Sequence, residues 1–211
     1  LYGWGLLAER ILPEIKVSFI SGTIFTGVCL ATTLAAFSAF FLPINIYSEV
    51  LIIAAGFTGL FLNRSKISLQ SLERQNLKIL SVGTLLISFL ASFYPYILDH
   101  FGYYIPTVQW LNNFGYIKGL SNLDLTLGQA SFWHIFQSIF SHISDPFLRI
   151  NAVLLIIFLL YILEKKSWLF LLFLPLLLLF SQSPSPDLAV MILSLIAVNE
   201  ILLKSKNITF L

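Results

Sequence analysis

Residues 17–42 read VSFISGTIFTGVCLATTLAAFSAFFL, a continuous apolar and small-residue run without one charged side chain. A helix needs roughly 20 such residues to cross the hydrocarbon core of a bilayer. Five further apolar runs follow along the chain, so we predict an all-α polytopic membrane protein with about six crossings. We treat residues 1–211 as a single transmembrane domain. The predicted crossings are 17–42, 46–62, 79–96, 147–163, 168–181 and 188–203.

The composition of the whole chain agrees with this interpretation. Hydrophobic residues make up 58% and charged residues 10%, and the mean hydropathy is +0.90, whereas roughly a quarter of the residues of a soluble domain are charged. The runs are continuously apolar rather than alternating, which favours helices over a β-barrel. Cys29 is the only cysteine, so no disulfide framework is expected within one chain.

The lysines and arginines predict the orientation, because short cytoplasmic loops retain cations and translocated loops do not. In a six-crossing arrangement only Lys118 and Arg149 fall on the outer side. The outer side also receives one long loop, 97–146. The cations are dispersed over short turns, which argues against nucleic acid as a partner. The cations of the predicted cytoplasmic side are Arg10, Lys16, Arg64, Lys66, Arg74, Lys78, Lys165, Lys166, Lys204 and Lys206.

The outer loop begins with Asp99 and His100, directly after the third crossing. A carboxylate that is partly desolvated at this position would have a raised pKa, as a general base or a proton-sharing site requires. Tyr103, Tyr104 and Trp110 follow and suit the membrane interface. An equally physical interpretation is an aromatic belt on a flexible connector that has no catalytic task.

Residues 131–143 have an amphipathic pattern, with phenylalanines and isoleucines on one face and serines and histidines on the other. We expect a helix that lies flat in the interface. His134 and His142 would be about 12 Å apart along it, too far to bind one metal ion, so both are interpreted as residues of the polar face.

The last outer turn reads SQSPSPD, residues 181–187, and ends on Asp187 immediately before the sixth apolar run. One interpretation is that Asp187 caps the following helix. The other is that it faces the same outer cavity as Asp99. Two carboxylates there could share a metal ion, a proton or sugar hydroxyls.

The motifs at these positions resemble those of an uncharacterised family of bacterial polytopic membrane proteins, which itself resembles the GT-C glycosyltransferases. The resemblance covers most of the chain and identifies it as the N-terminal portion of a longer protein, in keeping with a first residue other than Met. The matching residues are Asp99-His100-Phe101-Gly102-Tyr103, Trp110, Gly115, Gly119-Leu120-Ser121-Asn122-Leu123, Gly128 and Ser183-Pro184-Ser185-Pro186-Asp187-Leu188.

The resemblance implies an enzyme of the bacterial inner membrane that transfers a sugar from a polyprenyl-phosphate donor on the outer side. Asp99 would be the catalytic base or a contact to a divalent cation, and residues 131–143 the interfacial helix. The family pattern has a histidine after the loop tyrosine and a basic pair after Asn-Leu, where this chain has Tyr104 and Asp124-Leu125. The donor phosphate must then be bound by other cations, such as Lys118 or Arg149, or outside this sequence. The substrate-binding candidates are His100, Tyr103, Tyr104, Trp110, Asn122, Asp124 and Asp187.

Two other functional classes remain open from the sequence. A lipid-glycan flippase or polymerase component would need charged or broken helices near the midplane, but Glu49 and Glu200 lie near the ends of their runs. A noncatalytic subunit would pack its helices against partner membrane subunits and would tolerate Asp99→Asn.

Overall fold

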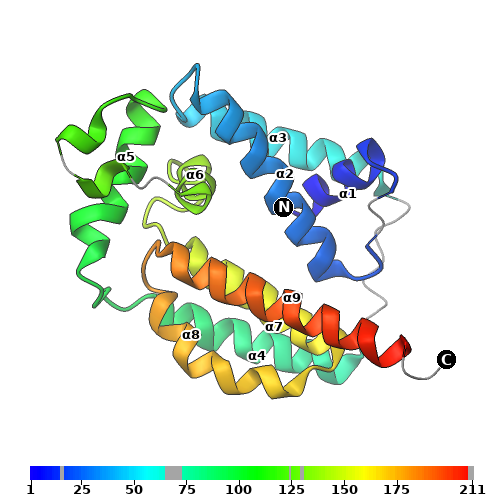
Figure 1. Ribbon diagram of the computed structural model, residues 1–211. Coiled ribbons are helices and arrows are strands. Elements are labelled where there is room, and N and C mark those ends of the chain that lie inside the picture. Colours follow the sequence, from blue (N-terminus) through cyan, green and yellow to red (C-terminus); the bar gives the residue numbers. More distant parts are fainter. Residues whose placement is uncertain (15–16, 65–72, 124, 129–130, 209–211) are drawn as a thin grey trace.

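A computed structural model describes residues 1–14, 17–64, 73–123, 125–128 and 131–208, with side chains up to residue 203 (Figure 1). The described residues contain helices and no strand. The elements are α1 (Tyr2–Ile11), α2 (Ile20–Ala39), α3 (Ile46–Leu62), α4 (Arg74–Ala91), η2 (His100–Tyr104), α5 (Ile105–Phe114), η3 (Leu120–Asn122), η4 (Leu125–Gly128), α6 (Phe132–Ile139), α7 (Ile150–Lys165), η5 (Trp168–Phe173), α8 (Leu174–Phe180) and α9 (Pro186–Ile208).

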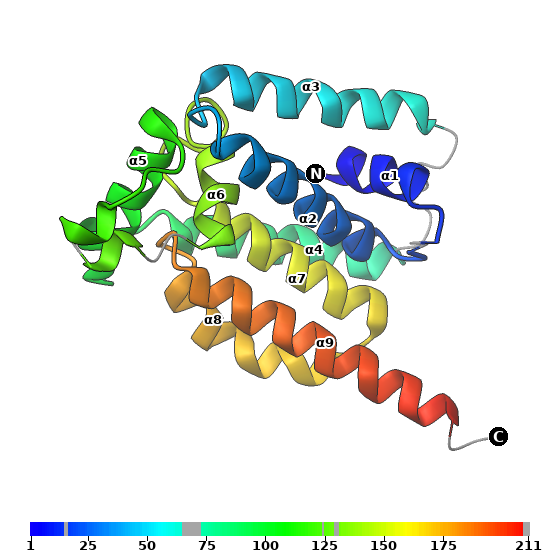
Figure 2. The same ribbon diagram turned by 45° about the horizontal axis from the view of Figure 1, so that its top comes forward.

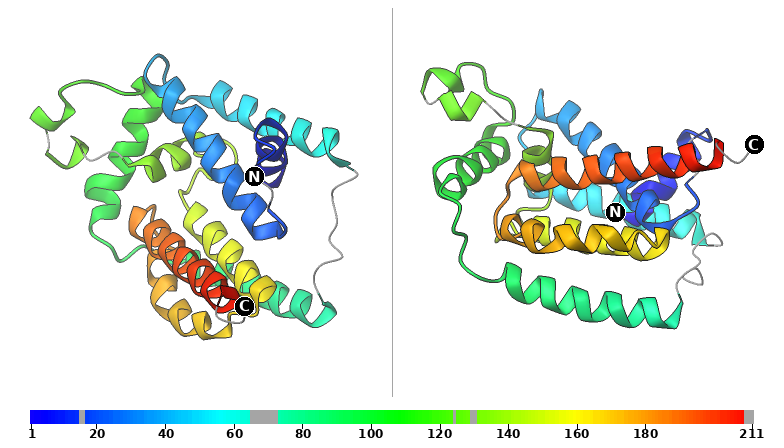
Figure 3. Two further views of the ribbon diagram at one scale, coloured as in Figure 1. Left: turned by 45° about the vertical axis from the view of Figure 1, so that its right-hand side comes forward. Right: turned by 60° about the horizontal axis from the view of Figure 1, so that its bottom comes forward.

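The long helices lie side by side and are joined at two ends (Figure 2). We call one the loop end; it holds α5, α6 and the turn 181–185. We call the other the basic end, where Arg10, Arg74 and Lys165 lie and where the described C-terminus of α9 points (Figure 3). The carboxylate of Glu164 fixes the basic end, because it accepts from the backbone N–H groups of Ile20 (2.8 Å) and Ser21 (2.9 Å) and so caps α2.

Two of the described helices are long and apolar enough to cross a membrane, by length and composition alone: α2, and residues Pro186–Leu203 of α9. This is fewer than the six crossings that the sequence predicts. The segment 46–62 forms α3 with the predicted bounds, but α3 has 17 residues and α7 has 16. The predicted run 79–96 becomes α4, which begins earlier, at Arg74, and carries Lys78 in its second turn.

The predicted crossing 168–181 is a broken helix. Its first part, η5, is a 3₁₀-helix of six residues, and α8 continues it for seven. A 3₁₀-helix rises about 2.0 Å per residue and an α-helix about 1.5 Å, so the pair spans about 22 Å, close to the roughly 24 Å of α7. The 3₁₀ geometry therefore compensates for the small number of residues.

The predicted interfacial helix 131–143 differs from the expectation in two ways. The helix α6 ends at Ile139, and residues 142–144 instead donate their backbone N–H groups to the buried carboxylate of Glu49, at 2.7–2.9 Å. It is also buried on both faces from Trp133 to Ile139, so it does not lie at a surface. Its polar side chains are therefore buried inside the protein. Figures 1 and 2 show α6 standing across the long helices at the loop end.

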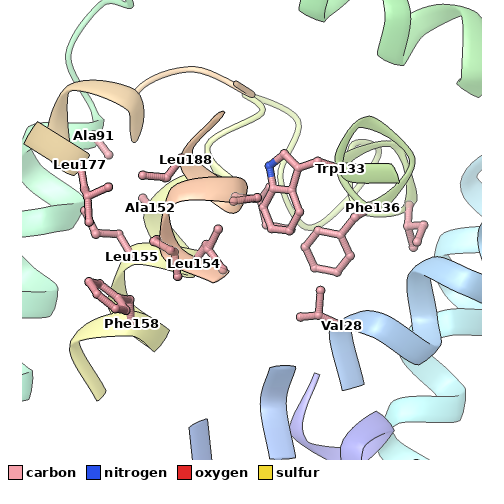
Figure 4. Packing of buried hydrophobic residues seen from close by; sticks show 14 of the residues in the cluster. Val28, Ala91, Trp133, Phe136, Ala152, Leu154, Leu155, Phe158, Leu177 and Leu188 are labelled. Atoms are coloured by element: carbon pink, nitrogen blue, oxygen red, sulfur yellow. The ribbon is translucent and has the colours of Figure 1, made fainter. Parts of the chain in front are cut away.

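The core surrounds this short helix. Trp133 and Phe136 of α6 meet Val28 of α2 on one side, and side chains of α7 and α9 lie on the other (Figure 4). Phe136 and Leu155 are at most 1% exposed. The core thus joins the α1–α3 group to the α4, α7, α8 and α9 group through α6.

The first helix, α1, lies outside the six predicted crossings and packs against α2 and α3 through glycines. A methyl group on Gly3 would overlap the carbonyl of Gly56, and one on Gly59 would overlap the carbonyl of Gly3. Trp4 also donates its indole N–H to the carbonyl of Ile52, at 2.8 Å. Small residues at such positions let helix backbones approach closely, as they do between membrane helices.

This contact predicts the effect of adding one methyl group. Gly59→Ala should lower the free energy of unfolding by about 2–3 kcal/mol, because backbone atoms rather than a flexible side chain would have to move. The control is Gly102→Ala, where an added methyl group has no atom within 4 Å; it should be neutral or stabilising by up to about 1 kcal/mol. Thermal unfolding in detergent micelles compares the two. Equal losses in both variants would contradict the close packing of α1 on α3.

Candidate functional site

The buried side chain of Asn151, in the first turn of α7, organises the loop end. Its amide N–H groups face the carbonyls of Phe180 (3.3 Å), Ser183 (2.6 Å) and Ser185 (2.9 Å). Its Oδ1 accepts from the indole of Trp133, at 2.6 Å. One side chain therefore holds the 181–185 turn against α6 and α7, and it satisfies carbonyls that would otherwise be buried without a partner.

The 181–185 turn receives two side chains from the outer loop. His100 Nδ1 lies 3.2 Å from the hydroxyl of Ser183, and the hydroxyl of Tyr104 lies 3.5 Å from that of Ser185. Both His100 and Tyr104 belong to η2, a π-helical turn that runs into α5. Short π-helical segments occur frequently at functional sites.

Ser185 continues the contact to Asp187. Its hydroxyl donates to Oδ2 of Asp187 (3.0 Å) and accepts from the backbone N–H of Asp187 (3.2 Å). Ser185 therefore caps α9, and Asp187 lies one step inside the first turn rather than at the cap. A chain of polar contacts leads from buried Tyr104 through Ser185 to an exposed carboxylate.

His134 lies behind this chain, fully buried. Its Nδ1 accepts from the backbone N–H of Ser131 (3.3 Å) in a capping box, and its ring lies 5.3 Å from that of Tyr103 and 5.4 Å from that of Tyr104. Burial lowers the pKa of His134 to about 4, although the charge of Asp187 opposes the shift. The ring is thus neutral with its proton on Nε2, and within the described part of the chain Nε2 has no hydrogen-bond partner.

The first carboxylate predicted from sequence, Asp99, is exposed beside η2. Protein side chains therefore do not bury Asp99, and its expected desolvation at the membrane interface stays a prediction. Burial raises the pKa of both Tyr103 and Tyr104, and the charges of Asp99 and Asp187 add to the shift. Both carboxylates thus act electrostatically on the same pair of phenols.

The other predicted binding residues lie apart from this group. Trp110 lines a separate pocket of 280 Å³ between α5, η3 and η4. Asn122 is exposed in η3, and Asp124 lies outside the described residues. The structure therefore brings together Asp99, His100, Tyr103, Tyr104 and Asp187.

An apolar groove of 390 Å³ opens beside the polar group, between α2 and α9. Ser131 and Pro186, which line it, are close neighbours in sequence of His134 and Asp187. The groove follows α9 for about 10 Å from Pro186 to Leu193. The residues that line it are Val28, Cys29, Thr32, Thr33, Ser131, Phe132, Trp133, Pro186, Ala189, Val190 and Leu193.

The arrangement can hold a polar group at the mouth of an apolar channel. Asp187 is exposed and can accept a hydroxyl hydrogen bond, whereas the Nε2–H donor of His134 is fully buried. Among the described residues, no group of three or more His, Cys, Asp or Glu side chains could hold a metal ion. A divalent cation would need water and ligand oxygens besides Asp187 or Asp99.

Sequence reasoning missed Asn151 and the role of His134. The signal for Asn151 was a single amide in the apolar run 147–163, because polar side chains within such runs usually have a structural or functional partner. His134 was interpreted as a residue of a solvated face, because periodicity does not show what covers that face.

The buried state of His134 predicts a pH dependence of stability. Its pKa of about 4 in the folded protein is below the value near 6.5 of an unfolded chain. The unfolded state therefore takes up the proton first, and stability falls by about 2 kcal/mol between pH 7.5 and pH 5. His134→Gln keeps a capping-box acceptor but should lose this part of the dependence, as followed by unfolding in detergent; His142→Gln is the control. An unchanged pH profile in His134→Gln would contradict the assignment.

Comparison with known proteins gives one match. No curated protein and no solved structure is detectably similar to the chain. The family model that matches covers residues 1–210, and its description is Domain of unknown function (DUF8201). The chain therefore belongs to the DUF8201 domain family.

Proposed function

We propose that this protein is a polytopic protein of the bacterial inner membrane that transfers a sugar from a polyprenyl-phosphate donor at the loop end, in the manner of a GT-C glycosyltransferase. The observation that carries the proposal is that Pro186, the residue before the exposed carboxylate of Asp187, lines the α2–α9 groove. A lipid-linked sugar needs an apolar surface for its chain beside polar groups for its sugar.

The exposed surface supports a membrane location with more crossings than two. Large apolar side chains are also exposed on helices other than α2 and α9, such as Phe61 (72% exposed) on α3, Leu85 (73%) on α4 and Leu172 (75%) on η5. Soluble monomers rarely expose contiguous patches of this kind. Helices of about 22–25 Å fit a bilayer that thins locally or whose headgroups meet flanking polar residues.

In this proposal Asp187 is the general base, in preference to Asp99. The acceptor hydroxyl would lie within hydrogen-bond reach of Asp187 and give up its proton as its oxygen attacks the sugar carbon, while the polyprenyl phosphate leaves. Ser185 positions the carboxylate by its hydrogen bond of 3.0 Å. Asp99 remains available at the same face to bind sugar hydroxyls.

Arg149 is the favoured cation for the donor phosphate. Its guanidinium donates to the carbonyl of Gln182, next to the 181–185 turn. Burial lowers the pKa of His100, and the charge of Arg149 lowers it further. The guanidinium of Arg149 therefore lies close to η2. Lys118, the other outer cation, is exposed in the loop after α5.

A noncatalytic membrane subunit is the second candidate. The Asn151 amide is saturated by protein partners, as expected of a structural hub. In that case the exposed faces of α3 and α9 would pack against partner membrane subunits, and neither carboxylate would matter. Flippase or polymerase function is less supported, because Glu49 is engaged by three backbone N–H groups.

Lipid mass spectrometry on the purified protein tests transfer. Wild type should retain polyprenyl phosphate or its glycosylated form, and Asp187→Asn should accumulate the sugar-bearing species and lose at least about 100-fold in transfer rate. Glu73→Gln, which removes an exposed carboxylate at the basic end, should behave as wild type.

Two outcomes of that experiment would change the residue assigned as the base or the proposed function itself. Accumulation in Asp99→Asn but not in Asp187→Asn would move the base to Asp99. Bulk phospholipid alone in every sample would overturn the donor groove and favour the noncatalytic subunit.

Cysteine labelling tests the orientation. In a Cys29→Ala background, Leu98→Cys at the loop end should react with a membrane-impermeant maleimide in intact cells, because Leu98 is 90% exposed. Lys166→Cys at the basic end should react only after the membrane is opened. Labelling of both sites in intact cells, or the reverse order, would contradict the proposed topology.

A further inference from the structure

A second apolar groove runs along α4 from Lys78, near the basic end, toward the loop end. It has a volume of 580 Å³ and runs between α4 and the broken helix η5–α8, with Leu159 of α7 at its base. Leu159 packs closely on Gly83, where an added methyl group would overlap its side chain. The lining residues are Lys78, Ile79, Val82, Gly83, Leu86, Ile87, Leu159, Leu171, Leu174, Pro175 and Leu178.

The charge at this groove is one-sided. Lys78 is the one charged residue in the lining, and Arg74 is one helical turn before it at the basic end. Neither cation forms an ion pair with any described residue, whereas Lys166 is paired with Glu73 at 3.3 Å. Apolar side chains therefore line the groove along its length, and two cations without ion-pair partners in the described part of the chain lie at its basic end.

The length of the groove fits one lipid leaflet. From Lys78 to Ile87 it follows α4 for about 13 Å. This is close to half of a hydrocarbon core of about 30 Å. An acyl chain that enters from the basic side would fill the groove while its headgroup stays level with Lys78 and Arg74.

We propose that the α4–α8 groove binds one anionic phospholipid of the leaflet at the basic end, with its phosphate at Lys78 and Arg74 and one acyl chain along Val82 and Leu86. The inference rests on the proposed membrane location but not on the proposed sugar transfer. Cations near a membrane surface each favour anionic over zwitterionic lipid by about fivefold. The same cations leave the groove unsuited to a neutral lipid.

The test measures lipid-dependent thermal stability of the delipidated protein in detergent, with phosphatidylglycerol or phosphatidylcholine added. Wild type should bind phosphatidylglycerol at least fivefold more tightly, as judged from the shift of the unfolding temperature with lipid concentration. Lys78→Gln should reduce this preference about fivefold, and Lys118→Gln, at the loop end, should leave it unchanged.

A matched pair of variants separates the groove from the general lipid surface. Val82→Trp fills the groove and should abolish the phosphatidylglycerol shift. Leu85→Trp, on the same helix and similarly exposed but outside the lining, should retain it. Equal shifts for the two lipids in wild type, or an unchanged shift in Val82→Trp, would overturn the proposal. A phosphatidylglycerol preference without polyprenyl lipid in mass spectrometry would leave this site standing while the transferase proposal fails.

Discussion

The side-chain amide of Asn151 is the interaction on which the loop end depends. Three segments far apart in sequence meet there: the start of α7, the 181–185 turn and helix α6. An apolar side chain at this position would leave the carbonyls of Ser183 and Ser185 buried without donors, at a cost of about 1–3 kcal/mol for each. The turn could then no longer place Ser185 and Asp187 against Tyr104, so the site follows from one structural hydrogen-bond centre.

Much of the helical framework could be predicted from apolar runs and their boundaries. Helix α3 has the predicted bounds because Asn45 both ends the preceding turn and caps the helix, accepting from the N–H groups of Tyr47 and Ser48. The start of α4 was placed five residues late, because polar residues such as Arg74 and Lys78 are helical there. Hydropathy records apolar content, and it therefore misses the polar first turns of a helix.

The candidate site was predicted less completely, for a different reason. The grouping of His100, Tyr104 and Asp187 follows from the predicted topology, because the third crossing ends and the sixth begins on the same side. The exposure of Asp99 and the burial of His134 depend instead on how η2 and α6 pack. An amphipathic pattern identifies two faces of α6, but it does not say that Tyr103 and Tyr104 cover the polar one.

At the loop end, the side chains whose hydrogen bonds hold the fold differ from those that remain free to bind a ligand. The hydrogen-bonding groups of Asn151 and Glu49 are occupied by backbone and side-chain partners. A ligand could bind to them only if these hydrogen bonds within the protein were broken. Nε2–H of His134 and the exposed carboxylates of Asp187 and Asp99 retain unused capacity. A buried donor without a partner costs free energy, but His134 is fully buried and does not line the α2–α9 groove, so a ligand in the groove leaves that cost in place. Binding energy at this site should therefore concentrate on the exposed carboxylates of Asp187 and Asp99 rather than spread over the aromatic residues of the loop.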